Sequence, residues 1–74
     1  MTPLLRFRVQ VRAGGTLSTM YVDETTPAHA ARRAIRSWRN DARAGESCGQ
    51  PGYTRFIFHG PRRSDVATVN VYPT

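Results

Sequence analysis

The sequence predicts an α+β fold in which one helix packs on one face of a four-stranded sheet. Three observations support this: apolar and polar residues alternate over residues 5–12, a helix-start signal lies at residues 23–27, and two further alternating segments lie near the carboxyl end. The predicted order is ββαββ, and such an arrangement buries the apolar stripe of the helix against the sheet. We expect one small basic domain over residues 1–74.

The first two strands are predicted to form a hairpin. Alternation over residues 5–12 is typical of a strand with one buried face. Gly14 and Gly15 suit the positive φ angles of a two-residue turn, and a second strand follows over residues 17–22. The expected core-face pairs are Val11 with Ser18, Val9 with Met20, and Phe7 with Val22. The expected outer-face pairs are Arg12 with Leu17, Gln10 with Thr19, Arg8 with Tyr21, and Arg6 with Asp23.

A helix is predicted from Pro27 to about Arg43. Thr26 is a suitable N-cap, and proline is favoured at the first helical position. Gly45 is the expected stop. The apolar stripe consists of Ala31, Ala34, Ile35, Trp38 and Ala42, with Trp38 as its main core residue.

The carboxyl-terminal half is predicted to contain a loop and two strands. Residues 44–52 are rich in glycine and indicate a mobile surface loop, whereas residues 53–59 and 66–72 alternate as strands do. Phe56, Phe58, Val69 and Val71 should point inward, and Tyr53, Arg55, Ile57, His59, Thr68, Asn70 and Tyr72 outward.

The expected strand order is 2-1-4-3, in a mixed or antiparallel sheet. This order places the first strand centrally and makes the crossover through the helix right-handed. It resembles ubiquitin-like folds in topology alone.

Arginine supplies all the fixed positive charge of the chain. Eleven arginines and no lysine face five acidic residues, which gives a net charge of +6. Guanidinium groups present planar forks of donors that suit phosphate, so nucleic acid is the first partner to consider. The candidate binding residues are Arg6, Arg8, Arg12, Tyr21, Arg32, Arg36, Arg39, Arg43, Arg55, Arg62 and Arg63.

These candidates fall into a sheet-face set, a helix ridge and a turn pair. On the sheet face, arginines and tyrosines suit single strands, because tyrosines stack on unpaired bases. The ridge of Arg32, Arg36, Arg39 and Arg43 suits a duplex backbone, and Arg62 and Arg63 would add phosphate contacts. The plain alternatives are a solvated basic surface and a cation-π pair between Arg8 and Tyr21.

Two other functions fit the same chain. One is a protein-interaction or inhibitor module that docks on an acidic partner, either through the strand edge at Leu17 and Thr19 or through the sheet face with Ile57 and Tyr72, and that could form a homodimer. The other is a metal-independent ribonuclease that uses His59 as general acid or base. We expect no enzyme activity, because the acids and histidines form no recognisable catalytic constellation.

No cofactor or metal site is predicted. Cys48 is the only cysteine, so an intramolecular disulfide is excluded, and zinc-ligand spacing is missing. The chain has no nucleotide-binding glycine loop. It also has neither an apolar signal segment nor an apolar run of about 20 residues, so we expect a cytoplasmic protein without a membrane partner.

Overall fold

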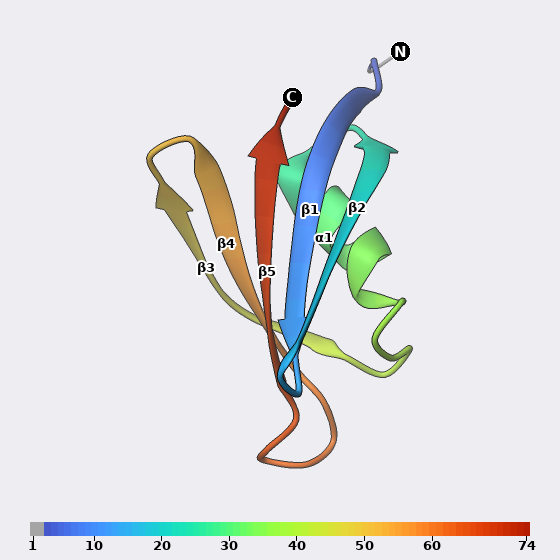
Figure 1. The fold of residues 1–74 in the computed structure, drawn as a ribbon, viewed down its shortest axis with the longest axis vertical. Helices are drawn as coiled ribbons and strands as arrows, with labels where there is room; N and C mark the ends of the chain where they lie inside the picture. The colour runs from blue at the N-terminus through green and yellow to red at the C-terminus, as the bar shows by residue number, and fades with distance from the viewer. Residues whose placement is uncertain (1–2) are drawn as a thin grey trace.

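The computed structural model describes residues 3–74. One helix and five strands follow in the order β1 (Leu5–Ala13), β2 (Thr16–Glu24), α1 (Pro27–Ile35), β3 (Arg43–Gln50), β4 (Tyr53–His59) and β5 (Val66–Pro73). The strands form one sheet in the order β2-β1-β5-β4-β3, and α1 lies against one side of it (Figure 1). The α+β class is confirmed. No helix in residues 3–74 is long and apolar enough to cross a membrane.

The β1–β2 hairpin has the predicted register at every pair. Gly14 and Gly15 form the turn with φ angles of 58° and 80°. Glycine adopts this left-handed backbone without the steric cost that a Cβ atom brings, so the turn follows directly from the local sequence.

Helix α1 begins as predicted but ends eight residues early, at Ile35 instead of Arg43. The Thr26 hydroxyl accepts a hydrogen bond from the His29 amide at 3.2 Å. At the other end, the amide and hydroxyl of Ser37 both donate to the Ala34 carbonyl, at 3.0 and 2.7 Å. These bonds satisfy a carbonyl of the last turn, which allows the chain to leave the helix.

The prediction that Trp38 is the main core residue of the helix is therefore wrong. It lies beyond the end of α1 and is only partly buried, at the margin of the core. The buried residues of α1 are Ala30, Ala31, Ala34 and Ile35. The small side chains of the three alanines let the helix lie close to the sheet.

The predicted loop at residues 44–52 is wrong, because most of it belongs to the edge strand β3. This strand pairs with β4 and shifts register between Ala44 and Ser47. A Cβ atom on Gly45 would lie 2.8 Å from the His59 ring and 3.1 Å from the Ile57 carbonyl oxygen, so glycine favours the close pairing there. β3 is the fifth strand, which the predicted ββαββ order lacks.

The other four strands keep the predicted order, as β2-β1-β5-β4, and all neighbours are antiparallel. The predicted crossover through the helix to the strand at residues 53–59 is wrong, because α1 leads into β3 and β4 runs antiparallel to β2. The analogy with ubiquitin-like topology is therefore limited to the order of these four strands. Phe58, Val69 and Val71 are buried as predicted, and Phe56 is partly buried against them. The buried residues of the sheet and of α1 form one core cluster. The sheet face opposite α1 therefore presents the polar members of each alternating strand.

Candidate functional site

The outer sheet face, opposite α1, brings the predicted sheet-face residues together. The register pairs Arg8 with Tyr21 on one side and with Tyr72 on the other, and it pairs Arg55 with Asn70. The residues that share this face by alternation are Arg6, Arg8, Gln10, Arg12, Leu17, Thr19, Tyr21, Tyr53, Arg55, Ile57, His59, Thr68, Asn70 and Tyr72.

Four of these side chains form a continuous arginine–tyrosine stack across β1, β5 and β4. The Arg8 guanidinium carbon lies 4.5 Å from the centroid of the Tyr72 ring. The Tyr72 and Tyr53 centroids are 4.9 Å apart, with ring planes inclined by 31°. The Arg55 guanidinium lies 5.9 Å from the Tyr53 centroid and donates to its hydroxyl at 3.1 Å. The stack joins cations and π faces over three neighbouring strands.

Polar contacts hold two members of this stack. Arg55 Nε donates to Asn70 Oδ1 at 3.3 Å, and the Tyr72 hydroxyl donates to Gln10 Oε1 at 3.4 Å. A shallow depression lies beside the stack and is lined by Gln10, Arg12, Leu17, Arg55, Ile57, Thr68, Asn70 and Tyr72. The outer face thus offers aromatic rings, amides and guanidinium groups around one concave area.

Arg8 forms its cation-π contact with Tyr72 and not with Tyr21, the partner predicted from sequence. The reason is that β1 is central, so Arg8 has a tyrosine on both sides. Tyr21 remains 62% exposed. Tyr53 and Tyr72 were predicted to face outward but were not among the candidate binding residues. Their alternation was the only sequence signal for their place in the stack.

The outer face keeps most of its positive charge uncompensated. Arg6 pairs with Asp23 at 3.0 Å, and this hydrogen bond holds the pKa of Asp23 below its ordinary value of 3.8. Within residues 3–74, Arg8, Arg12 and Arg55 form no ion pair. Glu46 is the acid at the β3 rim, where it lines a small depression that Arg55 also lines.

The predicted ridge of Arg32, Arg36, Arg39 and Arg43 does not lie on one helix. Arg32 is in α1, Arg36 follows its last residue, Arg39 is in the next loop and Arg43 begins β3. All four nevertheless line one open depression on the helix side, together with Ile35, Asn40, Ala42, Ala44 and Phe58. The four arginines are therefore brought together by the folding of α1, the following loop and β3 around this depression, and not by spacing along one helix.

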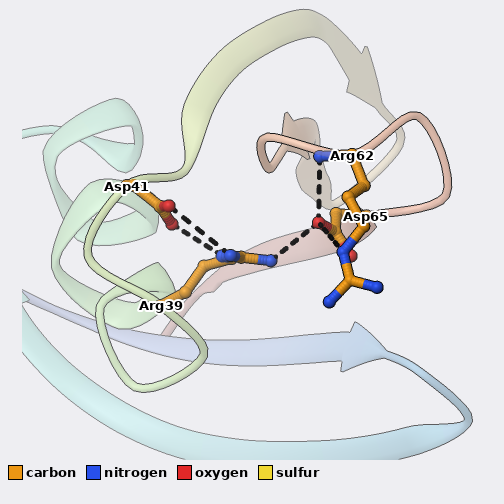
Figure 2. A network of polar contacts seen from close by, with 4 residues as sticks. All are labelled: Arg39, Asp41, Arg62 and Asp65. Atoms are coloured by element: carbon orange, nitrogen blue, oxygen red, sulfur yellow. Dashed lines mark hydrogen bonds and ion pairs between the residues drawn. The ribbon is translucent and has the colours of Figure 1, made fainter.

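Arg39 differs from the rest of that group because two carboxylates hold it. Its Nε lies 2.6 Å from Asp41 Oδ1, and its Nη1 lies 2.9 Å from Asp65 Oδ2, as Figure 2 shows. Asp65 Oδ2 also accepts a hydrogen bond from the Arg62 backbone amide at 3.1 Å. We call these four residues the Arg39 network. It joins the loop after α1 to the loop between β4 and β5.

Gly60 makes room for the Arg39 network. A Cβ atom at this position would lie 2.8 Å from Arg39 Nη1 and 2.7 Å from Asp65 Cβ. The Gly60 amide also donates to the Asp65 carbonyl at 2.8 Å. Arg39 therefore stabilises the fold, and two carboxylates balance its positive charge.

The remaining candidates are scattered. The Arg62 side chain is 85% exposed, with Nε 4.0 Å from Asp65 Oδ2, and Arg63 is exposed in the same loop. His59 ends β4 beside Gly45, and Cys48 is an exposed free thiol on β3. In the described part of the chain, no three His, Cys, Asp or Glu side chains gather as a metal-binding group.

Comparisons with known proteins identify no relative. No protein-family model, curated protein or solved structure matches this chain.

Proposed function

We propose that the outer sheet face binds single-stranded nucleic acid without catalysing a reaction. In this proposal, the guanidinium groups of Arg8, Arg12 and Arg55 contact phosphates, and tyrosine rings receive unpaired bases. The observation that supports it is the arginine–tyrosine stack beside arginines that form no ion pair within residues 3–74. Basic grooves with stacking aromatic residues are the usual surface for single strands.

The stack also holds its side chains in place before a ligand arrives. Arg55 is held by Asn70 and Tyr53, and Tyr72 by Gln10. An arginine that is already ordered loses less rotamer entropy on binding than a freely rotating one. Each guanidinium has five N–H donors, so one or two internal contacts leave donors for a phosphate.

The helix side supports a duplex-binding role less well. Arg39 is held by Asp41 and Asp65, and Arg43 lies on β3 instead of extending the helix. Arg32 and Arg36 lie near the carboxyl end of α1, where the helix dipole stabilises positive charge. Their position is therefore explained without a bound ligand. The outer face is therefore the better candidate.

A titration with two charge-matched variants tests the proposal. Fluorescence anisotropy of a labelled oligothymidine is measured over a salt series, and affinity should fall with a log–log slope of about −0.7 per phosphate contacted. The double variant Arg8→Gln/Arg55→Gln should bind much more weakly than Arg32→Gln/Arg36→Gln, although both lose two charges. Absence of binding at low salt, or equal losses in both variants, would contradict a site on the outer face.

A further inference from the structure

Strand β2 is a regular edge of the sheet that pairs on one side only. It pairs with β1 from Thr16 to Glu24 without a register shift, and no strand among residues 3–74 lies on its other side. The opposite edge, β3, has a register shift between Ala44 and Ser47. Because bulges discourage strand addition and regular edges permit it, β2 is the edge that can accept another strand.

The turn geometry shows which backbone groups of β2 are available. A two-residue turn makes its flanking residues, Ala13 and Thr16, a hydrogen-bonded pair. Hydrogen-bonded and non-hydrogen-bonded pairs alternate along an antiparallel ladder. The amide and carbonyl groups of Leu17, Thr19 and Tyr21 therefore point away from β1, toward the open edge.

A depression on the helix side adjoins this edge. It is lined by Val11, Ala13, Thr16, Ser18, Ser37 and Trp38. Trp38 is partly buried, and the Arg39 guanidinium lies 5.4 Å from its ring. Side chains of an added strand point alternately to the two faces, so every second one would fall on the side of this depression. An apolar side chain there would cover the exposed part of Trp38.

We propose that β2 binds an extended, acidic segment of a partner protein by strand addition. A row of outward amides and carbonyls recognises an extended backbone, and the Trp38 depression receives one apolar side chain. The two acids of β2, Asp23 and Glu24, are paired with arginines, whereas Arg8 and Arg12 on the neighbouring strand β1 form no ion pair within residues 3–74, so acidic flanks are favoured. This site lies at the sheet edge and does not depend on nucleic-acid binding at the outer face.

A single strand fits this edge better than a second copy of the whole chain. A second copy would bring another +6 charge. In Figure 1 the end of α1 and the loop after it extend past β2, so a second sheet that joined this edge with its helix on the same face would meet them. The partner is therefore a peptide segment of opposite charge.

The test uses the complete ¹⁵N-labelled chain and synthetic peptides as long as the nine residues of β2. The probes carry alternating apolar side chains and threonine, with aspartates at both ends. We expect the NMR chemical shifts of the Leu17, Thr19 and Tyr21 amides and of the Trp38 indole to change when a probe is added. Matched probes with N-methyl groups on alternate amides lose backbone hydrogen bonds and should bind about tenfold more weakly or worse.

A protein variant provides the reciprocal control. Thr19→Pro removes an amide that points away from β1, so it should abolish probe binding while the β1–β2 pairing persists; Thr19→Ala should bind normally. Three results would overturn the proposal: no shifts at these amides with any probe, equal binding of N-methylated probes, or the same shifts on raising the protein concentration alone. The last result would identify a second copy as the occupant.

Discussion

The outer sheet face and the helix side use the same residue type in different ways. On the outer face, Arg8 and Arg55 lie against tyrosine rings. On the helix side, Arg33 pairs with Glu24 at 3.0 Å, and Arg39 pairs with two aspartates. A ring holds a guanidinium without neutralising it, whereas a carboxylate cancels its charge. Net charge alone therefore does not identify the surface that is available to an anion.

The largest expected effect comes from removing the rings of the outer face. Tyr53→Leu/Tyr72→Leu keeps apolar bulk but abolishes stacking, which contributes about 1–3 kcal/mol per base in single-strand complexes. We expect oligothymidine affinity to fall about tenfold or more by fluorescence anisotropy. Unchanged affinity in a variant that is folded by circular dichroism would show that the rings only support the sheet.

The next largest effect is expected on stability and not on binding, at Gly60 on the helix side. Gly60→Ala places a methyl group against Arg39 and Asp65, and such overpacking typically costs about 1–3 kcal/mol. Chemical denaturation should show this loss in the free energy of unfolding, while oligothymidine affinity below the transition stays unchanged. Gly49→Ala is the control, because a Cβ atom there meets no atom within 4 Å. Equal stability of the two variants would contradict the role given to the Arg39 network.

A smaller effect concerns acid pH. The hydrogen bond from Arg39 holds the pKa of Asp41 below its ordinary value of 3.8. Because the folded-state pKa is the lower one, this carboxylate stabilises the fold above the ordinary value, and the contribution is lost as pH falls through the folded-state pKa. Asp41→Asn should therefore show less loss of stability below pH 3.8 than the parent chain in thermal melts. A parallel pH dependence in both would contradict this coupling.

The smallest effect is expected at the turn pair. Arg63 is exposed in the loop between β4 and β5, at the opposite end of these two strands from Tyr53 and Tyr72 (Figure 1). Arg63→Gln should lower affinity only through the general field, less than Arg12→Gln does, when both are measured at the same salt concentration. A larger loss for Arg63→Gln would extend the site to that loop.

The hairpin was predictable because its determinants are local. Alternation selects the buried face, and two adjacent glycines fix the turn, so the register follows. The end of α1 was not predictable from periodicity, since Trp38 and Ala42 continue the apolar stripe while Ser37 ends the helix through a bond to Ala34. Strand β3 was not predicted because an exposed, glycine-containing edge strand shows no apolar alternation. It forms a strand through its pairing with β4, which the local sequence does not reveal.

The candidate site shows the same division between local and long-range information. Alternation alone placed Arg8, Arg55 and the tyrosines on one face. The contact of Arg8 with Tyr72 instead of Tyr21 depends on the neighbouring strand β5, which follows much later in the sequence. Arg39 and Asp65 likewise meet only in the folded chain, so a spacing rule along one helix assigned Arg39 to the wrong group.

The most direct test of the outer-face site is a map of NMR shift changes on adding oligothymidine to the complete ¹⁵N-labelled chain. If the outer face is the site, the largest changes fall on Arg8, Tyr53, Arg55 and Tyr72, including the arginine side-chain Nε–H signals, and Arg32 and Arg36 change little. Dominant changes at Arg32, Arg36 and Arg43, with the stack unaffected, would contradict it and assign the anion to the helix side.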